Sequence, residues 1–498
     1  MRIIIGMFAL AICGHLADAH AASLRVGVVG LPRTLGHPYA ISNLPAIYTF
    51  TALYDALTFV DGKGQLSPWL ATGWRRTADL TWEMTLRPGV RFSNGEPFNA
   101  AAVVHAVTYL TSPAAATDTS AQELSSLASA RAIDELTVKI STKMPNPALA
   151  RELSALRIVA PRLWNELGAE GYARAPVGTG PFKVDRWGAA AITFSANKDS
   201  WRSPKVDGLE IRALPEMATR VQGLLSGQLD IATALRVEDI PEVEAGGHRM
   251  QANPGTGVFT ISLNLERDPR LRDIRVRQAL NFAIDKNRIS SLMLGGLVKP
   301  ASQFTPPNAT GYDASLVPYP FDSDRARRLL AEAGFADGLD IVFEGVMGGA
   351  VSDGALFQQI AADLAKVGVR MEIRSILLSQ LSANMHSAAG WTGSAFGTDY
   401  GTAPSLDSLR SLKLHSCLHP YKWFCDPEGL PMIERALAAN TEQERTDMTR
   451  AIFRRYHELF PAILLWDIVY FDGIRHEIGD VPAVGTWIMY DKITKSPS

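Results

Sequence analysis

The chain has 498 residues, 47% of them apolar and 20% charged, and its mean hydropathy is +0.02. This length exceeds what one hydrophobic core supports, so we expect two or more domains, and the composition is globular rather than disordered. Lys and Arg number 49 against 51 Asp and Glu, which gives a net charge of −2. Such a balance predicts no basic surface for nucleic acid and no acidic tail.

The N-terminus resembles a secretory signal. Arg2 precedes an apolar run over residues 3–12, and small residues suited to signal cleavage follow over 17–22. The run is shorter than the ~20 residues that cross a bilayer, which argues against a membrane anchor. A lipoprotein signal ending at Cys13 is the alternative, but it would need a small residue in place of the bulky Ile12. We therefore expect a mature protein in an oxidising compartment, the bacterial periplasm.

In an oxidising compartment, paired cysteines are expected to form disulfides. Cys13 leaves with the signal, so Cys417 and Cys425 form an even pair, and we predict a disulfide that closes a short loop. The alternative is a metal site, because His415 and His419 lie in the same segment. Their spacing matches none of the structural zinc patterns, so the disulfide is preferred.

The segment over residues 70–103 predicts strands followed by a helix. Apolar and polar residues alternate over 81–86, which is the period of a half-buried strand. A Pro-Gly turn at 88–89 then allows residues 90–92 to fold back as a second strand. Asn99 is a suitable N-cap for a helix over residues 100–109.

Three later segments repeat one pattern, in which an amphipathic helix ends at a glycine. In two of them the glycine is followed directly by a strand. Glycine just past a helix end is the usual left-handed cap, and helices alternating with strands indicate α/β layers. The three predicted helices and their glycines are 217–226 with Gly227, 323–333 with Gly334, and 357–367 with Gly368.

Six segments together resemble the peptide/nickel/opine family of extracellular solute-binding proteins, family 5, the ligand-capturing subunits of ATP-driven (ABC) importers. The resemblance implies an α/β, two-lobed periplasmic-binding-protein fold with a hinge and an extra subdomain on the first lobe. The segments are LATGWRRTADLTWEMTLRPGVRFSNGEPFNAAAVV (70–103 with its flank), PVGTGPFK (176–183), NKDSW (197–201), SGQLD (226–230), DIRVRQALNFAID (273–285) and FPAILL (460–465).

The resemblance also implies domain boundaries. Residues 1–21 are the signal peptide, 51–176 the extra subdomain and 266–473 the second lobe. The first lobe combines 22–50, 177–265 and 474–498. Two crossing segments would join the lobes, and the protein would act as a monomer.

The sequence offers no candidate for catalysis. It lacks the GxSxG, HExxH, CxxC and GxxxxGK[ST] motifs, and we predict no cofactor and no metal site. The GTGP stretch at 178–181 fits a tight turn better than a phosphate cradle, because Pro181 removes a backbone N–H. A binding protein is therefore preferred to an enzyme, with a secreted hydrolase as the alternative from another class.

The resemblance implies that an aromatic residue lines the cleft and that a nearby Asp holds the amino terminus of a peptide. Trp391 is the aromatic candidate, with core packing as its alternative. The Asp position falls on Ser394 in one alignment and on Asp399-Tyr400 in another, and a solvated loop carboxylate is the alternative for Asp399. A second wall could include Ser42, Asn43 and Tyr48.

One departure from the family bears on the ligand. Its dipeptide binders carry an Arg just before the helix predicted at 357–367, whereas residues 347–353 of this chain contain neither Arg nor Lys. The lost guanidinium argues against free dipeptides and leaves longer peptides and peptide-like solutes. A metal chelate or an opine/sugar conjugate is the alternative, with His386, His415 and His419 as candidate metal ligands. The expected partners are this ligand and an ABC permease–ATPase complex.

Overall fold

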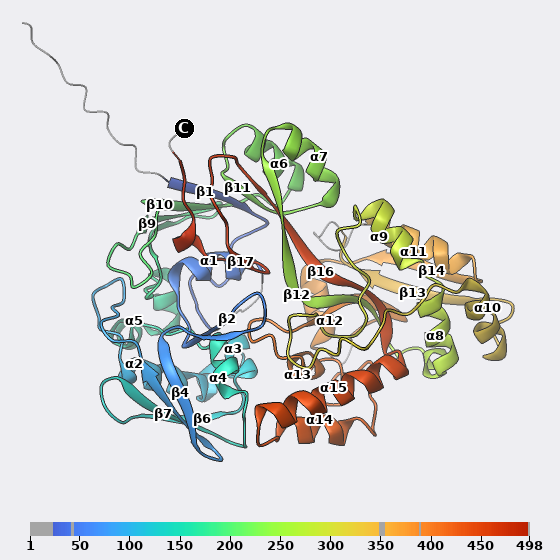
Figure 1. Ribbon diagram of the computed structural model, residues 1–498, viewed down its shortest axis with the longest axis horizontal. Helices are drawn as coiled ribbons and strands as arrows, with labels where there is room; N and C mark the ends of the chain where they lie inside the picture. The colour runs from blue at the N-terminus through green and yellow to red at the C-terminus, as the bar shows by residue number, and fades with distance from the viewer. Residues whose placement is uncertain (1–22, 41–43, 348–353, 388–389, 497–498) are drawn as a thin grey trace, which may run out of the picture.

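The computed structural model describes residues 23–40, 44–347, 354–387 and 390–496. Two lobes share one ten-stranded sheet, in the order β14-β13-β15-β12-β16-β11-β1-β10-β9-β8. Figure 1 shows the lobes side by side, joined near the centre by two long strands. In the described part of the chain, no helix combines the length and apolar character that crossing a membrane requires.

The first lobe is built on one end of this sheet. β1 pairs in parallel with β10 and β11, and β8, β9 and β10 form an antiparallel meander. Its strands are β1 (Ser23–Val28), β8 (Phe182–Trp187), β9 (Ala191–Ala196), β10 (Gly208–Ala213) and β11 (Ile231–Leu235), with a C-terminal hairpin of β17 (Ala483–Val484) and β18 (Trp487–Ile488). Its helices are α1 (Ala46–Leu53), α6 (Met217–Leu225) and α7 (Ile240–Ala245).

An extra subdomain extends this lobe and shares its hydrophobic core. A four-stranded antiparallel sheet in the order β4-β5-β7-β6 packs against α2. The strands are β2 (Thr58–Val60), β3 (Leu66–Pro68), β4 (Ala71–Ala78), β5 (Thr81–Leu86), β6 (Leu127–Ala132) and β7 (Thr137–Thr142). The helices are α2 (Ala100–Leu110), α3 (Thr119–Glu123), α4 (Leu149–Glu152) and α5 (Pro161–Arg174).

The segment over residues 70–103 is partly as predicted. The strand at 81–86 is β5, and the side chain of Asn99 caps α2 by accepting a hydrogen bond from the Ala101 N–H at 3.0 Å. The prediction of a second strand at 90–92 was wrong, because this stretch makes only an isolated bridge between Arg91 and Pro97. Both edges of β5 are already paired, with β4 and β7.

The second lobe contains β13 (Leu339–Gly345), β14 (Val369–Ser375) and β15 (Ala395–Gly401). Two predicted glycine caps are confirmed: Gly227 and Gly334 directly follow the last capping residue of their helices and have φ of +75° and +90°. Gly368 also has a positive φ, +87°, but α11 ends at Ala365 and a turn separates the two. The helices are α8 (Ile274–Phe282), α9 (Lys286–Met293), α10 (Ser323–Glu332), α11 (Gly354–Ala365), α12 (Leu378–Met385), α13 (Leu409–Leu412), α14 (Leu430–Leu437) and α15 (Glu442–Leu459).

Two long strands connect the lobes: β12 (Arg249–Leu263) and β16 (Ala462–Ile474). They pair antiparallel along most of their length, and their register shifts between Pro254 and Val258. Side chains from Val258 onward belong to the core of the second lobe, whereas Ile474 belongs to the core of the first. The strand pair therefore passes from one core to the other and forms the connection on which the lobes can bend.

A buried carboxylate, Asp55, holds several family segments together in the first lobe. It accepts hydrogen bonds from Trp69 (2.9 Å), Thr179 (2.8 Å), Trp201 (2.9 Å) and Arg202 (2.9 Å). Thr179 comes from the PVGTGPFK segment and Trp201 from NKDSW. Residues from separate segments of the chain thus form one polar cluster around Asp55. We call this cluster, Asp55 with Trp69, Thr179, Trp201 and Arg202, the Asp55 hub.

The GTGP turn packs against the end of α1. The Gly180 N–H donates to the Leu53 carbonyl at 2.9 Å, and a Cβ on Gly178 would lie 1.9 Å from the same oxygen. Glycine is required there by the close approach of two backbones rather than by an anion.

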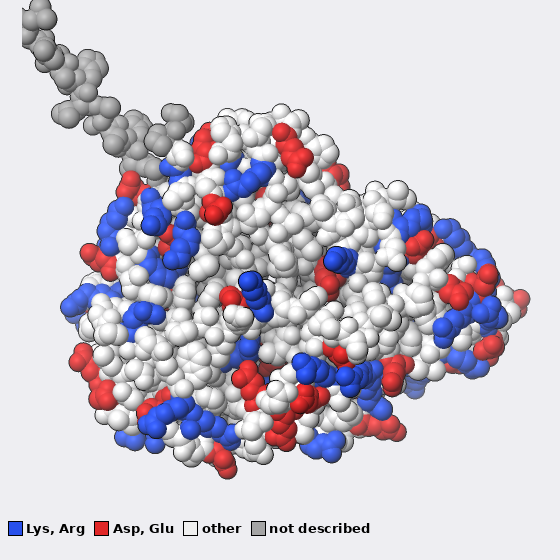
Figure 2. Space-filling model, viewed as in Figure 1, with Lys and Arg blue, Asp and Glu red and all other residues white. Residues whose placement is uncertain are grey.

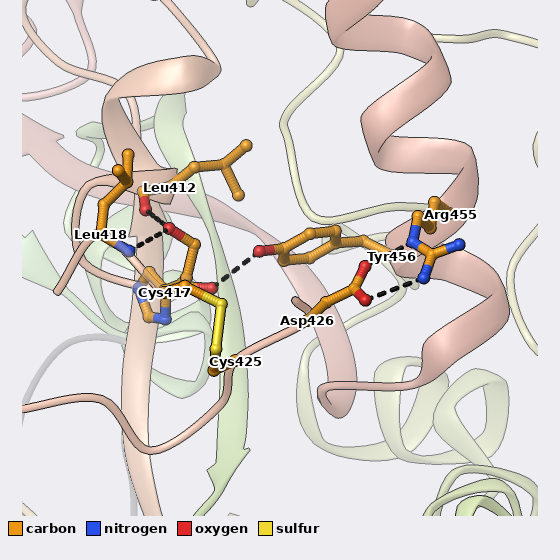
Figure 3. Close-up of a disulfide and its surroundings, with 9 residues drawn as sticks. Leu412, Cys417, Leu418, Cys425, Asp426, Arg455 and Tyr456 are labelled. Carbon is orange, nitrogen blue, oxygen red and sulfur yellow. Dashed lines mark hydrogen bonds and ion pairs between the residues drawn. A yellow bond between two sulfur atoms is a disulfide. The ribbon is translucent and has the colours of Figure 1, made fainter. Parts of the chain in front are cut away.

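The predicted disulfide between Cys417 and Cys425 is present. Figure 3 shows the bonded pair beside α15, where the Tyr456 hydroxyl donates to the His415 carbonyl at 3.1 Å. Arg455 of the same helix binds Asp426, with Nη2 and Oδ1 2.8 Å apart. The disulfide segment is therefore fixed to α15 on both sides of the cross-link.

Candidate functional site

A pocket of about 180 Å³ lies between the two lobes and the extra subdomain. Every part of the fold contributes to it, and most of its wall is apolar. Asp399 and Arg410 are the charged residues of its lining. The other lining residues include Ile47, Val484 and Trp487 of the first lobe, Phe59 and Ser154 of the subdomain, Thr256 and Tyr470 of the connecting strands, and Gly401 and Pro404 of the second lobe.

Asp399 is the acidic group of this pocket. It lies on β15, opposite Phe259 of β12, and its side chain is open to solvent. The surrounding protein raises the pKa of Asp399 above its ordinary value by desolvation, which outweighs the opposite effects of the nearby Arg410 charge and of the residue's own backbone N–H. Because burial penalises an unpaired charge, the ionised carboxylate of Asp399 is stabilised most by a cationic group of a ligand that binds beside it.

His415 holds the backbone of β15 at this point. Its Nε2 lies 3.0 Å from the Asp399 carbonyl oxygen, and its ring stacks on Tyr400 at 3.7 Å between centroids. Burial lowers the pKa of His415 to about 3, so the ring is neutral and Nε2–H can donate to that carbonyl. Both contacts fix the strand from which the Asp399 side chain projects.

Arg410 of α13 is the basic group of the pocket. Its Nη1 donates to the Gly401 carbonyl at 3.2 Å, and its Nη2 pairs with Glu123 at the end of α3. Since Glu123 belongs to the extra subdomain and Arg410 to the second lobe, this ion pair joins the two parts of the fold beside the pocket. About a third of the Arg410 side chain is exposed (32%).

An aromatic wall faces these charges. Phe59 stacks on Trp69 with 4.8 Å between ring centroids and meets the edge of Trp487 at 6.0 Å. Trp69 in turn donates its indole N–H to Asp55. The Asp55 hub thus supports the wall of the pocket from behind.

The remaining predicted site residues lie elsewhere or outside the described residues. Trp391 is 7% exposed, stacks on Phe396 at 3.6 Å and does not line the pocket. Ser394 is buried just before β15, five residues and about 16 Å along the chain from Asp399 at 3.3 Å per residue. Tyr48 is buried within α1, and Ser42 and Asn43 lie outside the described residues.

Tyr400 follows Asp399 but points to the other face of β15, because successive strand residues alternate. Its ring packs on His415 and, at 4.9 Å, on Phe304 in the second core. Of the predicted residues, the structure therefore brings Asp399 alone to the described pocket lining.

The histidines named as metal candidates are only partly together. His386 and His419 have ring centroids 6.3 Å apart, while His415 is engaged by β15. Across the described residues, no three His, Cys, Asp or Glu side chains are grouped as a metal site would need.

Sequence reasoning missed Phe59, Arg410, Tyr470 and Trp487. None belongs to a motif, and only folding brings these four positions together.

A second pocket, of about 330 Å³, lies on the other side of β16. Val469 and Phe471 line it, whereas Tyr470 between them lines the first pocket, because alternate strand residues face opposite sides. Its wall also includes Val237 of the first lobe and Leu356 of the second. We call it the back pocket.

The surface is electrostatically mixed. Figure 2 shows basic and acidic side chains interspersed around the rim of the face in view, with a largely uncharged centre. This agrees with the balanced net charge of −2.

Comparison with known proteins agrees with this geometry. A model described as "Bacterial extracellular solute-binding proteins, family 5 Middle" matches residues 65–411, which is more than half of the chain. The chain belongs to this family. The family 5 match begins at the β3 strand of the extra subdomain and ends in α13, so it includes both Asp399 and Arg410.

Individual family 5 proteins are similar along nearly the whole chain. The glutathione-binding protein GsiB of Escherichia coli K12 is 27% identical over 468 residues, 90% of each chain. The fold matches DppA of Helicobacter pylori, solved with the peptide STSA, with a TM-score of 0.81 and 19% identity. The match covers 96% of this chain and 99% of the DppA chain. The fold also matches NikZ of Campylobacter jejuni, solved with Ni(L-His), with a TM-score of 0.82 and 19% identity. This match covers 95% of this chain and 99% of the NikZ chain.

Proposed function

We propose that this protein captures a peptide or peptide-like solute with a free amino group and delivers it to the permease of an ABC importer. The observation that carries the proposal is Asp399. It is a solvent-open carboxylate in a largely apolar pocket between two lobes. A ligand ammonium is the group that such a carboxylate binds best, since charge-assisted hydrogen bonds are the stronger ones.

The aromatic wall supports the same class of ligand. Apolar side chains of a peptide can pack against Phe59 and Trp487, while polar side chains such as Thr256 and Ser154 are placed to bind its backbone. The similarity in sequence to a glutathione-binding protein supports a peptide. The folds of DppA and NikZ match equally well and do not separate a peptide from a metal chelate.

Lobe closure is the proposed mechanism. In this form the extra subdomain of the first lobe touches the second lobe: Arg410 pairs with Glu123, and Arg151 of α4 donates to the Ser405 carbonyl at 3.1 Å. A ligand that contacts both lobes binds the closed form better and shifts the population toward it. The closed, loaded form would then dock on the permease.

We further propose a periplasmic, monomeric protein without catalytic activity, released by cleavage of residues 1–21. The chain would pass from the first lobe to the second between Pro254 and Val258 of β12, about ten residues before the boundary at 265–266 that the sequence resemblance implied. It would return between Phe471 and Ile474 of β16, at the implied boundary. The register shift in β12 and the division of the two cores support these positions.

Calorimetry with tripeptides tests the proposal. A tripeptide with a free amino group should bind, and N-acetylation or D399N should each weaken binding by about 10- to 100-fold, the value of hydrogen bonds to a charged group. The two changes should not add, because both remove the same contact. If no peptide binds while a nickel chelate does, or if peptides are recovered as fragments, the proposed function is wrong.

A further inference from the structure

The pocket lining holds one acid and one base, Asp399 and Arg410, whose charges attract each other through space. Asp399 Oδ2 lies 2.9 Å, and Arg410 Nη1 3.8 Å, from the point where a Cβ on Gly401 would be, so the two charges are less than about 7 Å apart. Their side chains nevertheless form no ion pair, for Arg410 is engaged by Glu123 instead. Two opposite charges are thus presented side by side, on either side of Gly401.

Arg410 has donors to spare for a ligand. A guanidinium carries five N–H groups, and the contacts given above account for one to Gly401 and one to Glu123. Glu123 of the extra subdomain also orients the group, because it pairs with Nη2. The guanidinium is therefore fixed beside Asp399 with N–H groups left to bind a carboxylate, which is its preferred partner.

The spacing of the charges limits the ligand. The termini of an extended tripeptide are about 10 Å apart at 3.3–3.6 Å per residue, too far to reach both groups at once. An α-amino-acid head group carries its ammonium and carboxylate on one carbon. Such a head group can place the ammonium at Asp399 and the carboxylate at Arg410 simultaneously.

We propose, building on the proposed function, that Asp399 and Arg410 together bind one intact α-amino-acid head group, so that the preferred solutes are joined to the rest of the ligand through the side chain of that residue. γ-Glutamyl peptides have this chemistry. The remainder of the ligand then lies along the aromatic wall of Phe59 and Trp487. Arg410 thereby supplies the carboxylate contact that the segment before α11 lacks.

Two isomeric tripeptides test this assignment directly. γ-Glu-Cys-Gly and α-Glu-Cys-Gly have the same composition and charge and differ only in whether the head group is intact. Calorimetry on the wild-type protein, under reducing conditions too mild to open the Cys417–Cys425 disulfide, should show the γ-linked isomer binding about 10- to 100-fold more tightly. Equal affinities for the two isomers would overturn the assignment.

Variants locate the preference at Arg410. R410M should abolish the difference between the isomers, and R410K should restore part of it, because an ammonium keeps the charge but not the fork of donors. K413M is the matched control: it removes one positive charge from the same short segment, and Lys413 does not line the ligand pocket. K413M should keep the full preference for the γ-linked isomer.

The outcomes separate the two proposals. If both isomers bind equally and N-acetylation still weakens them, the peptide-binding function holds and the head-group assignment is wrong. A preference that persists in R410M also refutes the assignment. If neither isomer nor any other peptide binds the wild-type protein, the proposed function itself fails.

Discussion

Replacing Asp55 by alanine should cost more stability than any substitution of an exposed charge in the first lobe. Asp55 is fully buried, and Arg202, which is 5% exposed, donates to it and also pairs with Asp491 at 2.5 Å. D55A leaves the guanidinium with one carboxylate instead of two. It also leaves the indole N–H groups of Trp69 and Trp201 without their acceptor.

The magnitude follows from these contacts. Removing one partner of a buried ion pair costs about 3–5 kcal/mol, because the other charge stays buried without its counterpart. The exposed pair Lys198–Asp207 in the same lobe is the matched control: its charges are 2.6 Å apart, but both side chains are about half exposed. D207A should therefore cost at most about 1 kcal/mol.

Urea unfolding followed by tryptophan fluorescence measures the difference, since seven of the ten tryptophans, Trp69 and Trp201 among them, belong to the first lobe and its subdomain. D55A should shift the transition of the first lobe to lower urea, whereas D207A should leave it nearly unchanged. If the two variants unfold at the same urea concentration, the Asp55 hub does not hold the lobe together and the reasoning fails.

Three further predictions concern other parts of the molecule. C417S/C425S should lower the free energy of unfolding by about 2–3 kcal/mol, from the closure entropy of a loop of about eight residues, and urea unfolding with and without reductant checks this. Burial raises the pKa of Asp472 to about 7, so the native state holds a proton that the unfolded chain releases near pH 4. The free energy of unfolding should therefore fall by up to about 4 kcal/mol between pH 4 and 7, and D472N should flatten this slope in urea titrations; an unchanged slope would contradict the assignment. Ligand affinity should weaken as the pH falls through the raised pKa of Asp399, and calorimetry at several pH values should find no such trend in D399N.

Local signals in the sequence predicted local structure well. The Asn99 cap and the glycines that follow α6 and α10 depend on a few neighbouring residues, so their side-chain and backbone preferences decide the outcome. The strand at 90–92 was predicted from the same kind of signal and does not form. The edges of β5 are filled by β4 and β7, and β7 lies about fifty residues further along the chain.

The candidate site depends even more on contacts between residues that are distant in the sequence. Asp399 could be named because a family resemblance pointed to an acidic residue near it. Phe59, Arg410 and Trp487 come from three distant parts of the chain, and their proximity depends on how the lobes pack. No periodicity or motif spacing encodes that packing.

The charges and the apolar wall of the pocket lie on different lobes, which divides their effects on binding kinetics. Asp399 and Arg410 belong to the second lobe, whereas Phe59 and Trp487 belong to the first lobe and its subdomain. We expect a charged solute to meet the second lobe first, so the association rate should fall as ionic strength rises. Contact with the aromatic wall follows only on closure, so shortening Phe59 should mainly shorten the residence time of the ligand.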